Sequence, residues 1–164
     1  MANKSVEQKY AELCPHFGKW EKIKDMVDQN IDLMVNFSQS GHPAWGDPGN
    51  HPWVWGHQLA YNTEAILWGG LLEKKFADKP EITVAGLIMQ NDFGKAYELG
   101  FNEFIKTSKI KINFVFERIE PTAPTITNQM TTLASKNPDV FIAMTAGTSC
   151  TQAIQEAANN GLRD

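Results

Sequence analysis

The chain has 164 residues, of which 42% are hydrophobic and 21% charged, so it can bury the core of one domain or form a piece of something larger. Its formal net charge is −4 and its basic residues are scattered, which argues against nucleic acid as a partner. No apolar run approaches the roughly 20 residues of a membrane-spanning helix, and the start MANKSVEQKY lacks the apolar core of a secretory signal, so we expect neither membrane insertion nor export of the chain as given.

The first part of the chain gives a weaker pattern than the rest. Trp20, Ile23 and Val27 are spaced as on one face of a helix, and the apolar run IDLMVNF at 31–37 predicts a strand after it. The stretch from 41 to 56, GHPAWGDPGNHPWVWG, then gathers prolines, glycines and tryptophans in one loop. The helix predicted directly after this loop is marked by Ile66, Leu67, Leu71, Leu72 and Phe76.

From residue 82 onward, strands alternate with amphipathic helices. The nearly continuous apolar run ITVAGLIM at 82–89 predicts a strand buried on both faces. Residues 93–106 follow as an amphipathic helix, and Asp92 is placed to cap its start. Further strands are predicted at 111–120 and 139–144.

Two more helices complete the pattern. Thr125 is placed to cap the first of them, which ends at Asn137 and Pro138, and the second stops at Gly161. The apolar stripe of this last helix comprises Cys150, Ala153, Ile154, Ala157, Ala158 and Leu162. Strands alternating with helices predict an α/β fold, with a parallel sheet, right-handed crossovers and helices on its faces.

Three of the predicted strands end in loops suited to binding. Small, polar or glycine-containing segments follow each of them: FSQSGHPA after Phe37, QNDFG after Met89 and TAGTS after Met144. Ligands of open parallel sheets bind beyond the carboxyl ends of the strands, and the last two loops lead into helices whose backbone N–H groups can meet a carboxylate or another acceptor. One such loop is more often only a turn and a cap, but three together favour a ligand site.

Catalytic patterns have less support. His42, His51 and His57 do not have the spacing of a metal pair, and no Asp, Glu or Cys array accompanies them. Ser149 and Cys150 resemble a nucleophile elbow only faintly, because GTSCT is not GxSxG and Cys150 lies on the apolar stripe. Neither GxGxxG nor a Walker pattern is present, so the sequence predicts no cofactor and favours a protein that is not an enzyme.

Several segments together resemble a known family. VAGLIMQNDFGKAYELGFNEFIK, ASKNPDVFIAMTAG and AIQEAANNGLRD closely resemble the second lobe of type I periplasmic binding proteins, the branched-chain amino acid receptor family of ABC importers. GHPAWGDPGNHPWVWG is similar to that family's ATxPxLTDPGxxPYVF segment, which leaves the first lobe toward the interlobe crossing. The resemblance covers roughly residues 31 to 164, and its specificity comes from the order of the segments.

The resemblance implies an incomplete fold, with the end of lobe one and the first half of lobe two. Residues 1–58 would belong to lobe one, with poorly matched N-terminal helices, and residues 59–164 to lobe two. Family members close two lobes on a small ligand outside the cytoplasmic membrane and deliver it to an ABC permease, without catalysis. The implied function is binding of an amino acid, an amide or another small organic solute for an importer; a ligand-sensing receptor or regulator of the same fold is the alternative.

The resemblance also implies a ligand site. The family's ATxP ligand loop falls on SGHP, where Ser40 and Gly41 offer main-chain donors and Gly41 replaces a threonine hydroxyl. Phe93 takes the place of the tyrosine in the family's DxYG turn, so the ring is kept and the polar tip is lost. Polar contacts would come from Thr145 or Thr148. These departures weaken the case for leucine, isoleucine or valine as the ligand.

The implied incompleteness has a consequence for stability. Dividing one lobe's strands between two incomplete sheets leaves the apolar helix faces around Leu71 and Phe101 without covering neighbours. We therefore expect the isolated chain to associate with itself or to fold loosely.

Overall fold

The computed structural model describes residues 37–52 and 54–162. The helix predicted around 20–27 and the strand predicted at 31–37, apart from its last residue, lie outside the described residues. None of the helices in the described part is long and apolar enough to cross a membrane.

The chain forms two compact units. The smaller unit contains β1 (Phe37–Gln39) and most of β2 (Val54–Gly56), which pair with each other. The short 3-10 helix η2 (Pro43–Gly46) lies between these strands in the sequence. The larger unit comprises Ser40–Ala44 and the chain from residue 56 onward, and it holds the main sheet.

Asp47 organises the loop that is rich in glycine and proline. Its Oδ1 accepts the backbone N–H groups of Gly49 at 3.0 Å and Asn50 at 3.3 Å, and its Oδ2 accepts the Asn50 side-chain amide at 2.6 Å. These bonds, the one from the Asn50 side chain first, hold the pKa of Asp47 below its ordinary value. The loop is therefore shaped by its own Asx-type turn.

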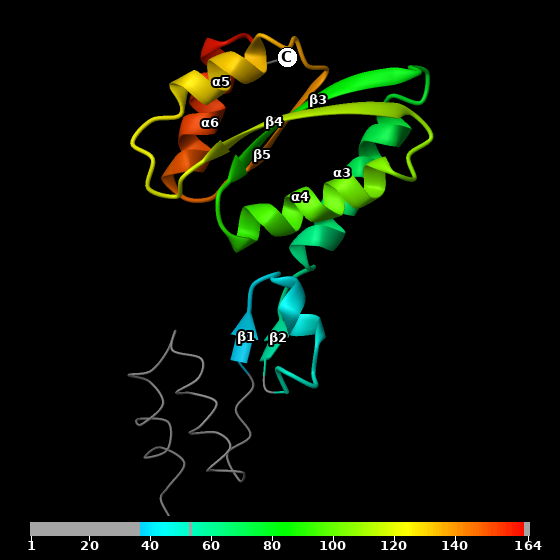
Figure 1. The fold of residues 1–164 in the computed structure, drawn as a ribbon, viewed down its shortest axis with the longest axis vertical. Helices are drawn as coiled ribbons and strands as arrows, with labels where there is room; N and C mark the ends of the chain where they lie inside the picture. The colour runs from blue at the N-terminus through cyan, green and yellow to red at the C-terminus, as the bar shows by residue number, and fades with distance from the viewer. Residues whose placement is uncertain (1–36, 53, 163–164) are drawn as a thin grey trace, which may run out of the picture. The chain divides into compact units, whose positions relative to one another are not determined.

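The main sheet is parallel and three-stranded, with the order β4-β3-β5 (Figure 1). Its strands are β3 (Glu81–Met89), β4 (Lys111–Ile119) and β5 (Val140–Met144), which confirms the predicted strands and their parallel arrangement. The register pairs Ile88 of β3 with Met144 of β5, so these two strands end side by side.

Helices cover both faces of this sheet (Figure 1). α3 (Tyr61–Lys75) and α4 (Asp92–Ile105) lie on one face, and α5 (Thr127–Ala134) and α6 (Thr148–Asn159) lie on the other. The chain runs from β3 through α4 to β4, and then through α5 past β3 to β5, which leaves β3 in the centre.

The central strand divides its side chains between two cores. Ile82, Val84 and Ile88 point into the core under α3 and α4, whereas Ala85 and Leu87 point into the core under α5 and α6. All five are 1% exposed or less, because successive side chains of a strand alternate between faces and both faces are covered.

α3 and α4 approach each other closely at a glycine. A Cβ on Gly100 would lie 2.1 Å from the backbone oxygen of Asn62, so only glycine fits between the two helices at this point. The phenol of Tyr97 on α4 also stacks on Trp68 of α3, with ring centroids 4.7 Å apart and planes at 7°.

Two helix starts differ from the predicted ones by one residue. Asn91, and not Asp92, is the N-cap of α4: it has extended backbone, and its Oδ1 accepts the N–H of Gly94 at 3.0 Å. At α5 the N-cap is Ile126 and not Thr125, although the Thr125 hydroxyl accepts the first helical N–H at 3.4 Å. In both helices the N-cap is the sequence neighbour of the predicted residue, because the backbone conformation sets where the helix begins.

The end of α6 is as predicted. Gly161 has a φ of 71°, and the N–H groups of Gly161 and Leu162 bond to the carbonyls of Ala158 and Ala157 at 3.2 and 2.8 Å. This pair of bonds is the Schellman motif, which needs a residue that tolerates the left-handed conformation.

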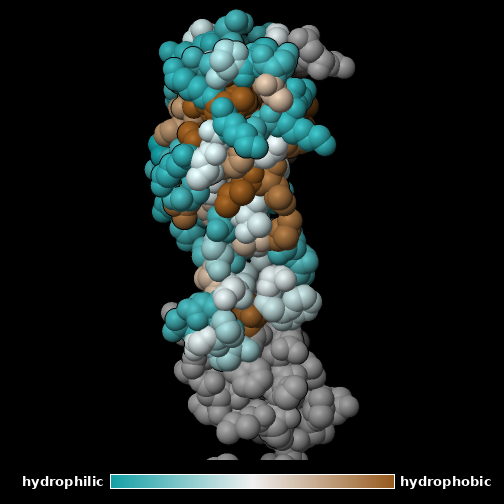
Figure 2. All heavy atoms as spheres, turned by 90° about the vertical axis from the view of Figure 1, so that its right-hand side faces the viewer, coloured by the Kyte–Doolittle hydropathy of each residue, from teal (hydrophilic) through white to brown (hydrophobic). Residues whose placement is uncertain are grey.

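The uncovered apolar faces agree only in part with the prediction. Leu71 is 63% exposed, but Phe101 is fully buried, because it packs edge-to-face on Phe114 of β4 with centroids 4.8 Å apart. Ile154 on the predicted apolar stripe of α6 is 68% exposed. Figure 2 shows hydrophobic residues gathered among hydrophilic ones on the side where α3 and α4 lie.

Candidate functional site

The carboxyl ends of β3 and β5 form the sheet edge from which helices leave toward opposite faces. β3 leads through Gln90 and Asn91 into α4, and β5 leads through residues 145–147 into α6. α4 packs in one core and α6 in the other. Such a reversal between neighbouring strands leaves a crevice at their carboxyl ends, which is where open parallel sheets bind ligands.

Thr145 presents a buried hydroxyl at this edge. The residue is 8% exposed, and its Oγ1 has no hydrogen-bond partner within the described chain. Leaving such a group unsatisfied costs about 1–3 kcal/mol, so an outside donor or acceptor placed there would be stabilised. Thr148 lies in the first turn of α6 and is exposed.

The loop that directly follows β1 packs on the start of α3. Gly41 is buried, and its carbonyl accepts the N–H of Tyr61 at 2.7 Å. A Cβ at Gly41 would lie 2.2 Å from the carbonyl oxygen of Leu59, so a threonine side chain does not fit this backbone conformation. Ser40 is exposed beside it.

Phe93 belongs to an aromatic cluster that joins α3 to α4. Its ring contacts those of Tyr61 and Tyr97 edge-on, with centroids 4.8 and 5.0 Å away, and Tyr61 and Tyr97 are themselves 5.1 Å apart. Tyr61 therefore links Phe93 to Gly41, so the structure brings these two predicted site residues together.

A carboxylate anchors the same cluster. The Tyr97 hydroxyl donates to Oε2 of Glu64 at 2.6 Å, which ties α4 to α3. Burial first, and then this bond and the Glu64 charge, raise the pKa of the Tyr97 phenol above its ordinary value. The hydroxyl is therefore a donor throughout the physiological range.

An open pocket of about 420 Å³ lies against this cluster and is called the α3–α4 pocket. Its lining residues are Gln58, Leu59, Tyr61, Glu64, Phe93 and Tyr97. Phe93 was predicted from the sequence, whereas Tyr61, Glu64 and Tyr97 were not. Glu64 and Tyr97, which share a hydrogen bond, are 33 residues apart along the chain, so no local sequence pattern predicts their contact.

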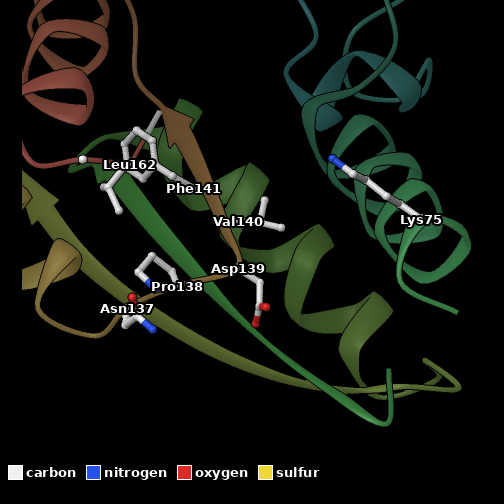
Figure 3. A pocket seen from close by; sticks show the side chains of 8 residues that line it. Lys75, Asn137, Pro138, Asp139, Val140, Phe141 and Leu162 are labelled. Carbon is white, nitrogen blue, oxygen red and sulfur yellow. The ribbon is translucent and has the colours of Figure 1, made fainter. Parts of the chain in front are cut away.

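A second hollow, of about 300 Å³, lies at the other end of the sheet (Figure 3). Its lining comes from α3, from the segment that enters β5, and from the end of α6: Lys75, Asn137, Pro138, Asp139, Val140, Phe141, Gly161 and Leu162. Because it adjoins the amino end of β5, it is separate from the strand ends at which parallel sheets bind ligands.

The residues weighed as catalytic in the sequence can be located in the described part of the chain. The described residues contain no group of three or more His, Cys, Asp or Glu placed to hold a metal ion. Ser149 is 3% exposed in the first turn of α6, and Cys150 beside it is half-buried. The Ser149 hydroxyl is thus not presented to a substrate from solvent.

Solved structures of periplasmic binding proteins share this α/β fold with a parallel sheet over most of the chain, which confirms the fold class expected from the sequence. Among similar solved structures is a fatty acid ABC transporter substrate-binding protein from Thermomonospora curvata, with a TM-score of 0.64 at 15% identity, covering 85% of this chain and 35% of that one. A branched-chain amino acid ABC transporter protein from Thermus thermophilus with bound valine has a TM-score of 0.61 at 15% identity, covering 85% and 36%.

A solute-binding protein of an ABC transporter from Rhodopseudomonas palustris BisB5, in complex with 3,4-dihydroxybenzoic acid, has a TM-score of 0.60 at 13% identity, covering 86% of this chain and 44% of that one. The chain thus spans less than half the length of each of these proteins. No protein-family model and no curated protein matches the sequence.

Proposed function

We propose that the chain is part of a solute-binding protein that serves an ABC importer, and that it supplies one wall of a site for a small organic solute. The fold supports this, since structures that share it include ABC transporter proteins for fatty acids and proteins solved with valine and with 3,4-dihydroxybenzoic acid. The full-length protein would work outside the cytoplasmic membrane and pass its solute, chemically unchanged, to a permease.

The observation that carries the proposal is the buried, unpartnered hydroxyl of Thr145. It lies where β5 ends beside β3, at the edge from which α4 and α6 diverge. A polar group buried without a partner is unfavourable for the free protein, and a solute that bonds to it removes that cost.

The remaining site residues have distinct roles in the proposal. The ring of Phe93 packs on the apolar part of the solute, and the exposed Thr148 hydroxyl offers a second polar contact. Ser40 and Gly41 contribute main-chain groups from the loop held against Tyr61. In the complete protein, closure of a second lobe would cover the solute.

A thermal-shift screen with a Thr145→Val variant tests the proposal. The 164-residue chain is screened against amino acids, amides, fatty acids and aromatic acids, and solutes that raise Tm are measured again with the variant. Valine keeps the branched shape without the hydroxyl, so we expect a Tm equal to or above that of the unmodified chain without solute, and a smaller solute-induced shift.

Thr151→Val, at an exposed threonine of α6, is the matched control and should leave the solute-induced shift unchanged. Phe93→Ala should reduce that shift as well. A screen in which no solute raises Tm, or in which Thr145→Val and Phe93→Ala both retain the full shift, contradicts the proposed function.

A further inference from the structure

The α3–α4 pocket has one charged wall and several aromatic ones. Among the described residues that line it, Glu64 is the only charged one, and no Lys, Arg or His faces the pocket. The apolar surface comes from the rings of Tyr61 and Phe93 and from Leu59, which is 55% exposed. The electrostatic character of the pocket is therefore set by a single carboxylate beside aromatic side chains.

The Glu64 carboxylate is held in place and keeps one oxygen available. Oε2 accepts the Tyr97 hydroxyl at 2.6 Å, whereas Oε1 has no hydrogen bond within the described chain. The side chain is half-buried and starts from the first turn of α3, so its position is fixed by both helices. A carboxylate oxygen of this kind accepts a charge-assisted hydrogen bond well, because no side chain has to be reordered first.

The helix ends do not turn the pocket into an anion site. α3 and α4 both begin beside it, and the amino end of a helix carries a partial positive charge. Each helix has a carboxylate in its first turn, Glu64 in α3 and Asp92 in α4, which offsets that charge. The remaining field at the pocket favours a cation, and aromatic faces attract cations as well.

We propose that the α3–α4 pocket binds the protonated amino group of an organic amine, with Oε1 of Glu64 accepting its hydrogen bond and the rings of Phe93 and Tyr61 contacting the adjoining carbon atoms. The inference rests on the proposed function, because it names the solute class for one part of the same wall. Glu64 is then the residue that selects an ammonium over a neutral or anionic group of the same shape.

The test uses three probes of one shape and different charge: benzylammonium chloride, benzyl alcohol and sodium benzoate. Each is titrated at constant ionic strength into the ¹⁵N-labelled 164-residue chain, and the backbone amides of residues 58–64 and 93–97 are followed by NMR. We expect saturable shifts with benzylammonium and an affinity for benzyl alcohol lower by roughly fivefold or more, as for a partly exposed ion pair. Benzoate should bind more weakly than either.

Two variants assign this preference to Glu64. Glu64→Gln keeps an acceptor for the Tyr97 hydroxyl and removes the charge, so we expect the fold to persist and the benzylammonium affinity to fall by roughly fivefold. Glu103→Gln removes one negative charge from an exposed site of α4, where Glu103 pairs with Lys106, and should leave the affinity unchanged. The comparison of probes on the unmodified chain needs no variant, so it holds even if Glu64→Gln does not fold.

Equal binding of benzyl alcohol and benzylammonium, stronger binding of benzoate, or an unchanged affinity in Glu64→Gln overturns the inference. So does the absence of benzylammonium shifts at these amides. If this happens while the Thr145-dependent thermal shift is observed, the proposed function stands and only the amine specificity is wrong. If the Thr145-dependent shift is absent, the proposed function fails regardless of the amine result.

Discussion

The two faces of the same sheet are packed with different chemistry. The core under α3 and α4 is rich in aromatic rings: Tyr61, Trp68, Phe93, Tyr97, Phe101, Phe104, Phe114 and Phe116. The core under α5 and α6 is mainly aliphatic and includes Leu87, Ile119, Ile126, Met130 and Leu133. Both rest on alternate side chains of β3.

The difference shows how packing chemistry affects the candidate site. Large rings with polar tips fill a core and also reach its rim, where Tyr97 meets Glu64 and Phe93 lines an open pocket. Aliphatic side chains fill the core on the opposite face, and the polar group at the carboxyl end of β5 is the buried hydroxyl of Thr145. In the proposed site, the aromatic face would thus supply shape and charge, and the end of β5 would supply a hydrogen bond.

Truncating a large buried side chain on each face should have the largest effects. We expect Phe101→Ala to lower the free energy of unfolding by about 3–5 kcal/mol and Met130→Ala by about 2–5 kcal/mol, since both are fully buried. Because the two cores lie on opposite sides of β3, the double variant should be additive within about 0.5 kcal/mol. Urea unfolding measures all three, and strong coupling between the sites would contradict the separation of the cores.

Filling the close contact on the aromatic face should have the next largest effect. Gly100→Ala places a methyl group against the backbone of Asn62, which cannot move aside as a side chain can, so we expect a loss of about 1–3 kcal/mol in urea unfolding. Gly70→Ala is the control on α3, where a Cβ would meet no atom within 4 Å. It should stabilise the chain by about 0.5–1 kcal/mol, and a loss at Gly70 would mean that the outer face of α3 is covered in solution.

Removing the hydrogen bond between Tyr97 and Glu64 at the edge of the aromatic core should have a smaller effect. Tyr97→Phe keeps the ring that stacks on Trp68 but leaves Glu64 without its donor, and we expect a loss of about 1–2 kcal/mol. The matched control is Tyr61→Phe, since the Tyr61 hydroxyl makes no hydrogen bond within the described chain, and its effect should be smaller. Equal urea midpoints for the two variants would show that the Glu64 bond does not contribute to stability.

The smallest expected effect lies at the amino end of the sheet, away from the aromatic rim. The Lys79 ammonium at 2.6 Å and the backbone N–H of Thr83 at 2.8 Å hold the pKa of Asp139 below its ordinary value. A lowered folded pKa means that the carboxylate stabilises the fold above its unfolded pKa and loses this contribution as pH falls through the folded value.

Stability should therefore decrease as pH falls below about 5, toward and past the ordinary aspartate pKa. Asp139→Asn should reduce this decrease by less than about 1 kcal/mol, as for an exposed ion pair. Asp78→Asn, at an exposed carboxylate without a hydrogen bond or ion pair in the described chain, is the control for the loss of one charge. Urea midpoints at several pH values measure both variants, and identical pH profiles for Asp139→Asn and the unmodified chain would contradict the assignment.

Some of this protein could be determined from the sequence alone. The strands predicted at 82–89, 111–120 and 139–144 match β3, β4 and β5 within one residue at each end, because short and largely apolar runs indicate strands. The helices between them were predictable because one apolar stripe repeats every three to four residues. Gly161 was predictable as the end of α6 because the left-handed conformation favours glycine. These signals depend only on residues that are close together in the sequence, so they can be recognised without the structure.

The tertiary structure alone decided the contacts between distant residues. Asn91 and Asp92 are both suitable caps, and only the backbone path out of β3 selects Asn91. The burial of Phe101 depends on Phe114 from another strand, and the anchoring of Glu64 depends on Tyr97 from another helix. Such contacts depend on how the helices and strands pack in three dimensions. The spacing of residues within one segment does not identify the residues of another segment that they will contact.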